Sequence, residues 1–181
     1  MSTEHDRFGS SDFEFAYRHK PMVVAYCRRR GSQDPEGLAA ETFAIAWEKR
    51  SDLKRRDCRP WLIATARNLL HEEYRMRRKS MSVAPDFLAS IELGTEINYE
   101  IDSLDPEVDR ALRALSREDR EALLLVAWEE LTPSQAASSL GISATAFRVR
   151  LHRARRRFIK HFEASSPPIP IRPGIDTEQR A

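Results

Sequence analysis

The sequence lacks the segments that a membrane or secreted protein requires. Its longest uninterrupted apolar run, Ala122 to Trp128, has seven residues, whereas a transmembrane helix needs about 20. The first ten residues include Glu4, Asp6 and Arg7 and have no apolar core, unlike a secretory signal. We therefore expect a cytoplasmic protein that makes no contact with a membrane.

Cysteine is scarce, and the patterns typical of enzymes are missing. Cys27 and Cys58 form no CxxC pair and are too few for a disulfide framework, which fits a reducing compartment. The five histidines form neither HExxH nor a Cys/His cluster, so we predict no metal site. The sequence also has no glycine-rich phosphate-binding loop and no GxSxG motif. We expect no catalytic residues, no cofactor and no enzymatic activity.

Glycine is also rare, while charge is dense and segregated along the chain. With 6 glycines, 41% hydrophobic and 32% charged residues, the composition favours a largely helical protein. The net charge is +2, but residues 49–80 carry +7, residues 81–130 carry −9 and residues 131–181 carry +6. Clustered Lys and Arg gain affinity for nucleic acid by releasing phosphate counterions. Two basic blocks therefore predict DNA or RNA as partner, the alternative being solvated helix faces.

Helix start and stop signals divide the first half into three helices. Residues 12–30 have helical periodicity that Pro21 should kink or split. Asp34 is a suitable N-cap with Pro35 at the first helical position. Residues 51–59 are predicted to form a basic loop, after which Pro60 begins the third helix.

The third helix is predicted to have two unlike faces. At 100° per residue, one arc is apolar and comprises Leu62, Ile63, Ala66, Leu69, Leu70 and Tyr74. The opposite arc holds Trp61, Thr65, Asn68, Glu72 and Arg75. Trp61 is thus a large aromatic on a polar face, where it can meet a partner; alternatively it folds back onto a neighbouring helix.

The second half begins after a segment without periodicity. Residues 81–103 are acidic and contain Pro85 and Gly94, which indicates a flexible linker. Asp105 followed by Pro106 and Glu107 should start a helix. An apolar helix that should be buried follows Ser116, and the proline-rich residues 164–181 are expected to be disordered.

The most specific pattern lies between residues 131 and 162. Thr132 and Pro133 begin a helix, Gly141 supplies a left-handed turn and Ser143 caps the next helix, which together predict a helix-turn-helix. The last helix has an inward stripe of Phe147, Leu151, Ala154, Phe158 and Phe162. The side chains on its outward face are short or basic, as a recognition helix in the major groove requires. They belong to Thr145, Arg148, Val149, His152, Arg153 and Arg156.

These features resemble the extracytoplasmic-function (ECF) group of bacterial RNA polymerase sigma factors. Residues 13–78, with DPEGLAAETFAIAWEK, RPWLIATARNLL and RMRRK, look like region 2 of that family. Residues 104–162, with LTPSQAASSLGISATAFRVRLHRARRRF, look like region 4. The resemblance implies an all-α protein of two small helical domains joined by a flexible linker. The expected division is 1–80 for region 2, 81–103 for the linker, 104–163 for the helix-turn-helix domain and 164–181 for the tail.

The resemblance also implies partners and site residues. Core RNA polymerase would be bound through its β′ clamp helices and its β flap, with contacts from Glu36, Glu41, Phe43, Trp47 and Glu48. The −10 promoter element would be held by Lys54, Arg55, Arg56, Arg59, Trp61, Thr65, Asn68 and Arg75. The −35 element would be read by Ser143, Thr145, Arg148, Val149, His152, Arg153 and Arg156. The sequence departs from the family pattern at Gly37 and Ala40, which puts the details of the polymerase contact in doubt. It also departs at Val149, so the −35 sequence that is read should be unusual.

Two other functions fit parts of the sequence. A helix-turn-helix regulator could bind operators as a homodimer, with residues 1–80 for dimerisation and without polymerase. An interaction protein could sequester a regulator through the helical first half, which the basic loop and the face with Trp61 and Asn68 disfavour. An anti-sigma factor would be a further partner of a sigma factor.

Overall fold

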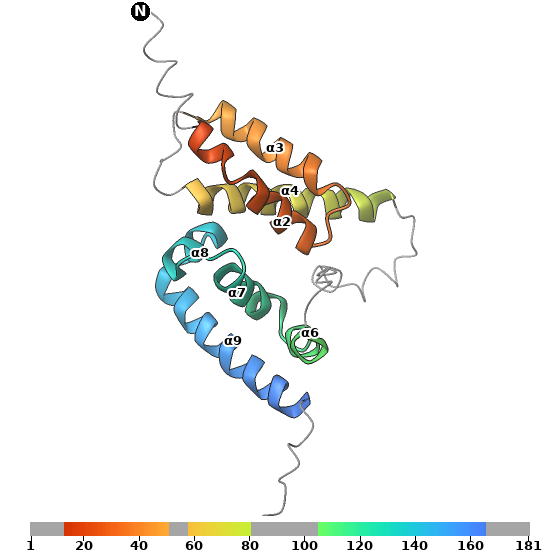
Figure 1. The fold of residues 1–181 in the computed structure, drawn as a ribbon, viewed down its shortest axis with the longest axis vertical. Coiled ribbons are helices and arrows are strands. Elements are labelled where there is room, and N and C mark those ends of the chain that lie inside the picture. The colour runs from red at the N-terminus through yellow and green to blue at the C-terminus, as the bar shows by residue number, and fades with distance from the viewer. Residues whose placement is uncertain (1–12, 51–57, 81–104, 166–181) are drawn as a thin grey trace, which may run out of the picture.

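The computed structural model describes residues 13–50, 58–80 and 105–165, and every regular element in these ranges is a helix (Figure 1). The all-α prediction is therefore confirmed. A short helix at 13–17 precedes α2 (Lys20–Arg29), α3 (Pro35–Glu48) and α4 (Cys58–Ser80). The second half contains α6 (Pro106–Arg113), α7 (Arg117–Ala127), α8 (Pro133–Leu140) and α9 (Ala144–Ser165).

The helices of the first half begin where proline and capping signals place them. Pro21 does not kink a continuous helix but lies in the first turn of α2, after a break at residues 18–19. N–H groups in the first turn have no acceptor within the helix, so a proline there costs no hydrogen bond. Asp34 caps α3 by accepting a hydrogen bond from the Gly37 N–H at 2.9 Å. The three helices pack their apolar faces together around Val23, Phe43 and Ile63.

Helix α4 begins at Cys58, two residues before the proline that was predicted to start it. The first four N–H groups of a helix have no intrahelical acceptor, so a proline at the third position costs no hydrogen bond. Arg59 consequently belongs to the helix and not to the preceding loop. The predicted apolar arc is confirmed, since Leu62, Ile63 and Ala66 are fully buried.

The second half is built from four capped helices. Asp105 and Ser116 accept hydrogen bonds from backbone N–H groups in the first turns of α6 and α7. Thr132 and Gln135 form a capping box at the start of α8. Gly141 ends α8 with φ of 66°, in the left-handed region, and α9 follows directly. The predicted helix-turn-helix is therefore present as α8 and α9.

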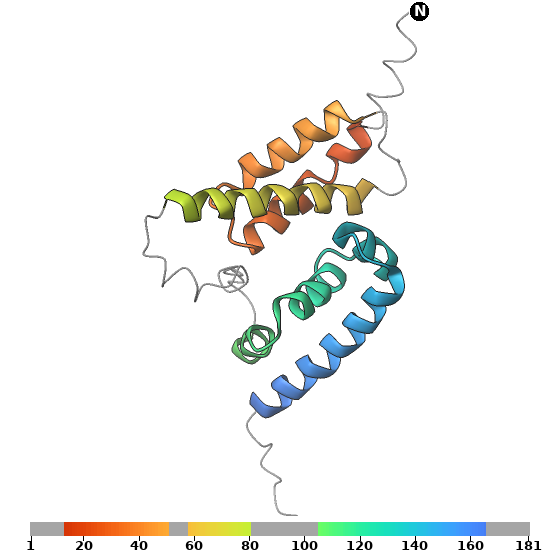
Figure 2. The same ribbon diagram turned by 180° about the vertical axis from the view of Figure 1, so that it is seen from behind.

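The two halves pack against each other, which the sequence prediction did not include. Figures 1 and 2 show α2, α3 and α4 on one side and α6 to α9 on the other, and α4 lies against α8. One apolar cluster joins buried residues of both halves, among them Tyr26 and Leu62 with Leu125, Leu131 and Phe147. The predicted linker, 81–103, and most of the predicted tail lie outside the described residues. The domain boundaries therefore stay predictions.

Both cysteines lie inside this shared core. Cys27 and Cys58 are free thiols, 0% and 3% exposed. Burial raises the pKa of Cys27 to about 12, so its reactive thiolate is rare at neutral pH. This environment is typical of a structural cysteine and unsuited to a redox sensor.

The turn between α8 and α9 generates a stability prediction. Gly141→Ala should lower the free energy of unfolding by about 1 to 2 kcal/mol, because a Cβ disfavours the left-handed conformation. No atom lies within 4 Å of the position of an added Cβ, so the cost comes from the backbone alone. Urea denaturation measures this change.

Gly141→Asn is the matched control, because asparagine tolerates the left-handed region better than alanine. It should lose less stability than Gly141→Ala. An alanine variant as stable as the original protein would contradict the observed turn.

Candidate nucleic-acid interface

Helix α9 presents one face to the protein and the other to solvent. Phe147, Leu151 and Ala154 are buried at 5% exposure or less and fix the orientation of the helix. All seven residues predicted to read the −35 element are exposed, namely Ser143, Thr145, Arg148, Val149, His152, Arg153 and Arg156. Ser143 also caps the helix by accepting a hydrogen bond from the Ala146 N–H at 3.1 Å. The structure thus brings these seven residues together on one open surface.

This surface is basic, and no acidic side chain of the described residues neutralises its predicted DNA-reading arginines. Arg148, Arg153 and Arg156 form no ion pair with any other described residue. The neighbouring Arg157, outside the predicted set, pairs instead with Asp119 of α7. A guanidinium that is not engaged within the protein can reach the O6 and N7 atoms of guanine or a phosphate.

Val149 is the apolar residue among the seven on this exposed surface. Its side chain is 46% exposed, whereas Phe147, Leu151 and Ala154 of the same helix are buried. In the major groove the C5-methyl group of thymine is the apolar feature that such a side chain can contact. Val149 between basic neighbours therefore suits a thymine in the element that is read.

The predicted −10 residues divide into an exposed and a partly buried group. Asn68 and Arg75 on α4 are exposed, and Arg75 is held by Glu72 at 2.5 Å. Thr65 is partly buried, and Trp61 packs in part against the apolar core. Trp61 therefore packs in part as the second interpretation expected, and its contact with a partner stays a prediction. The structure brings Asn68 and Arg75 to one exposed face, with Thr65 and Trp61 at its border.

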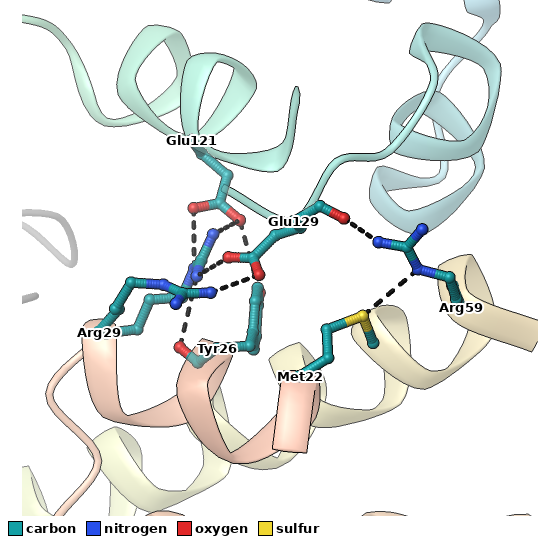
Figure 3. A network of polar contacts seen from close by, with 7 residues as sticks. Met22, Tyr26, Arg29, Arg59, Glu121 and Glu129 are labelled. Carbon is teal, nitrogen blue, oxygen red and sulfur yellow. Dashed lines mark hydrogen bonds and ion pairs between the residues drawn. The ribbon is translucent and has the colours of Figure 1, made fainter. Parts of the chain in front are cut away.

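Arg59 does not lie where the prediction placed it. It was expected in a basic loop facing DNA, together with Lys54, Arg55 and Arg56, which lie outside the described residues. In the structure its guanidinium donates hydrogen bonds to the backbone oxygen of Glu129 and to Met22 Sδ (Figure 3). As it stands, Arg59 is engaged with the second half of the protein and not free for a nucleotide.

The predicted polymerase-contact residues lie on α3, with one correction. Glu36, Glu41 and Glu48 are exposed, and Trp47 is 43% exposed. Phe43 is only 3% exposed and packs against Phe13 and Tyr17, so it supports the helix from inside and cannot meet a partner directly. Phe43 lies four residues after Ala39 and three before Ala46, both fully buried, and this apolar spacing is the sequence signal for an inward position.

Trp47 is held at the surface by its neighbours. Phe13 contacts it edge to face at 4.9 Å between ring centroids, and the guanidinium of Arg50 lies 4.5 Å from the ring centroid. An aromatic ring that is fixed and half open to solvent is a typical anchor of a protein interface. Together with the acidic side chains of Glu41 and Glu48, it makes α3 a candidate docking helix.

Sequence reasoning missed a buried charge cluster between the two halves. Figure 3 shows side chains from the end of α2 directed at Glu121 of α7 and at Glu129, which follows α7. Arg30 donates to both oxygens of Glu121 at 3.0 Å and to Glu129 at 3.0 Å. Arg29 donates to the other oxygen of Glu129 at 2.5 Å, and the Tyr26 hydroxyl donates to Glu121 at 3.4 Å. We call Tyr26, Arg29, Arg30, Glu121 and Glu129 the charge cluster.

The cluster lies in a low-dielectric environment. Arg30 is 2% exposed, and the side chain of Glu129 is fully buried. Burial alone would lower the pKa of Arg30, but the nearby Glu121, Tyr26 and Glu129 outweigh it and hold that pKa well above its usual value. Burial raises the pKa of Tyr26 in the same place. Arg30 is therefore a permanent charge whose compensation comes from the other half of the chain.

One feature of the sequence pointed to this cluster. Glu121 lies four residues before Leu125, on the inward face of α7. A carboxylate at such a position is rarely buried without a cationic partner. The pattern indicates a buried ion pair, but it does not say which of the many arginines supplies the positive charge.

Neither a metal site nor a membrane helix is apparent in the described part of the chain. No group of three or more His, Cys, Asp or Glu residues there is arranged to hold a metal ion. None of the described helices is long and apolar enough to cross a membrane.

Two family models match the chain, one in each half. Sigma-70 region 2 matches residues 15–80, and sigma-70 region 4 matches residues 106–158. The probable RNA polymerase sigma factor RfaY of Xanthomonas campestris pv. campestris is 33% identical over 147 residues. The match covers 77% of this chain and 37% of the relative, so the chain spans little more than a third of that protein's length.

Two solved structures share the fold. CnrH, solved in complex with the cytosolic domain of CnrY, has a TM-score of 0.55 at 24% identity, covering 91% of this chain and 93% of that one. The sigma factor RpoE of Bartonella quintana, solved with the anti-sigma factor NepR, has a TM-score of 0.57 at 21% identity, covering 88% and 99%. With sigma-70 region 2 matched at residues 15–80 and sigma-70 region 4 matched at residues 106–158, the chain belongs to the sigma-70 family.

Proposed function

We propose that the protein binds core RNA polymerase, directs initiation at promoters with matching −10 and −35 elements and stabilises the melted DNA. The observation that carries this proposal is the open, uncompensated basic face of α9 in a chain that also has region 2. Two modest DNA contacts become selective when polymerase holds them at a fixed spacing, because linked sites act at high effective concentration. The protein itself would catalyse no reaction.

Each half has a distinct part in this proposal. Helix α3 would dock on the β′ clamp helices through Trp47 and its exposed acids, and the exposed polar face of α4 would hold unpaired bases of the −10 element. The helix-turn-helix would read the −35 element and rest on the β flap. Transcription takes place in the cytoplasm, and we place the protein there.

An anti-sigma factor is proposed as a further partner. RpoE of Bartonella quintana, which shares this fold, was solved with an anti-sigma factor bound. The homodimeric operator-binding alternative assigns residues 1–80 to dimerisation, but that segment matches sigma-70 region 2. Polymerase dependence therefore separates the two functions.

The first prediction tests initiation. Added to core polymerase, the protein should produce run-off transcripts from a subset of genomic promoter fragments, and neither component alone should do so. Core activity is verified with another sigma factor. Binding to a palindromic duplex without polymerase, with no run-off product, would favour the homodimeric regulator instead.

The second prediction concerns base reading by α9. Arg148→Ala should cost about 1 to 3 kcal/mol at one −35 position, because a bidentate guanidinium contact discriminates one base pair by that amount. Binding of the holoenzyme to a set of single-substitution −35 variants measures it.

Lys160→Ala is the charge-matched control, because Lys160 is also exposed on α9 but lies outside the predicted set. It should weaken all −35 variants equally or not at all. If Arg148→Ala weakens every variant equally, Arg148 contacts a phosphate and not a base.

The third prediction concerns promoter melting. Asn68→Ala should lower the open-complex population by about tenfold, because contacts to unpaired bases, each worth roughly 1 to 3 kcal/mol when stacked, stabilise only melted DNA. Trp61→Ala should act in the same direction and also lower the stability of the fold, since Trp61 packs in part against the core. Permanganate reactivity of promoter thymines measures the melted fraction.

A premelted template should largely rescue Asn68→Ala. Gln33→Ala is the matched control, because it removes an exposed amide that lies outside the predicted −10 set, while the hydrogen bond that Gln33 donates to Glu73 of α4 comes from its backbone and is kept. Unchanged thymine reactivity in both α4 variants would remove Asn68 and Trp61 from the −10 site.

A further inference from the structure

A cavity of about 110 Å³ lies beside the charge cluster and is lined by residues of α2, α4, α7, α8 and α9. A single buried water needs about 10 to 15 Å³, so this space has room for several waters or for a small anion. Four arginines line it, namely Arg30, Arg67, Arg117 and Arg150. None of them was predicted to contact DNA or polymerase. The lining also includes Glu118, which is exposed, so the cavity is open to solvent on that side.

The protein compensates the positive charge of this cavity only in part. Glu121 and Glu129 neutralise Arg30 within the charge cluster. Arg67 and Arg150 are partly buried, yet they form no hydrogen bond and no ion pair with any other described residue. Like charges in a partly buried space repel each other more strongly than they do in water. Two guanidinium groups of the cavity therefore have donors to offer and no acceptor in the described part of the protein.

His71 reports the positive potential in the cavity that it helps to line. Its Nε2 lies 2.9 Å from Arg117 Nη2, and because a guanidinium can only donate, Nε2 is the acceptor. Burial lowers the pKa of His71, and the charges of Arg67 and Arg117 lower it further, while Glu121 acts in the opposite direction. The ring is thus held neutral beside two arginines, and a negative charge in the cavity would favour its protonated form.

The lining selects the chemistry of a ligand. A guanidinium presents its N–H donors in a planar fork that matches the oxygens of a phosphate group, often two at a time. A cation would be repelled by the same arginines. An apolar ligand could contact Leu70 and Leu140 but would leave the guanidinium groups without acceptors.

We propose that this cavity binds a small anion with one or two phosphate groups, for which Arg67 and Arg150 are the main donors, with Arg117 beside them. The anion would take the place of water and supply the acceptors that the described protein does not. This site goes beyond the proposed function and does not depend on it.

Calorimetric titration of the free, full-length chain tests the site. The probes are inorganic phosphate, pyrophosphate and ADP, at constant pH and ionic strength so that general screening stays the same. At least one probe should bind at one site per chain at millimolar concentration or below. It should also raise the melting temperature, because a ligand of the folded state stabilises that state. Tighter binding of ADP than of pyrophosphate would identify a nucleotide as the ligand, and the reverse order would identify a free anion.

Arg67→Gln and Arg150→Gln should each weaken binding about tenfold or more, because each removes charge-assisted hydrogen bonds to the anion. Without anion, neither variant should lower the melting temperature, since each removes one of several like charges. The matched controls are Lys79→Gln on α4 and Arg155→Gln on α9, which remove exposed positive charges of the same helices outside the cavity. Both controls should bind the anion as the original chain does.

The titration of His71, followed by NMR, locates the bound anion. Pyrophosphate should raise the pKa of His71, because a nearby negative charge favours the imidazolium. The charged groups that act on His71 without anion are Arg67 of its own helix and Arg117 and Glu121 of α7. His19 is the internal reference, because its pKa is also lowered by burial and by an arginine, but it lies outside the cavity lining. The pKa of His19 should not change.

Four results would overturn the site. They are the absence of saturable binding of all three probes at millimolar concentration, equal weakening by the cavity and control variants, and bound pyrophosphate that leaves the pKa of His71 unchanged. The fourth is a lower melting temperature of both cavity variants without anion, which would assign these arginines to the fold. None of these results bears on initiation at promoters, so the site and the proposed function fail separately.

Discussion

Arg30 is a permanently charged residue that is only 2% exposed to solvent. A guanidinium keeps its proton under all ordinary conditions, so the surroundings have to supply negative charge. Two carboxylates from the second half do so, and one of them, Glu129, also orders Arg29 and the turn that contacts Arg59. The position of α8 against α4, and hence the orientation of the recognition helix relative to α4, depends on this compensation.

Much of the fold follows from short-range signals in the sequence. Caps and prolines determine where α3, α6 and α8 begin, because each satisfies or avoids backbone donors within three residues. Apolar periodicity correctly identified the buried face of α4 and, through Phe147, Leu151 and Ala154, the outward face of α9. These features depend only on neighbours along one helix, so a single sequence contains enough information to predict them.

The relation between the halves could not be predicted in this way. Arg30 lies in a run of three arginines. Its spacing from Val23, Tyr26 and Cys27 places it on the inward face of the helix, unlike Arg28, which is exposed and pairs with Glu36. The spacing does not indicate which carboxylates compensate Arg30, because they lie about 90 to 100 residues away in the chain. The same reason explains Arg59, whose partner is a backbone oxygen of the other half, and which family resemblance alone assigned to DNA.

The turn after α7 has two roles. It leads into α8 of the helix-turn-helix, and it carries Glu129, which pairs with Arg30 of region 2. This limits how freely the two halves can be exchanged between related proteins. A chimera that takes residues 105–165 from another member of the family would leave Arg29 and Arg30 without their carboxylates unless the donor has acids at both positions. The two regions are separate units in the sequence, but the ion pairs between them require that Arg29, Arg30, Glu121 and Glu129 be kept together.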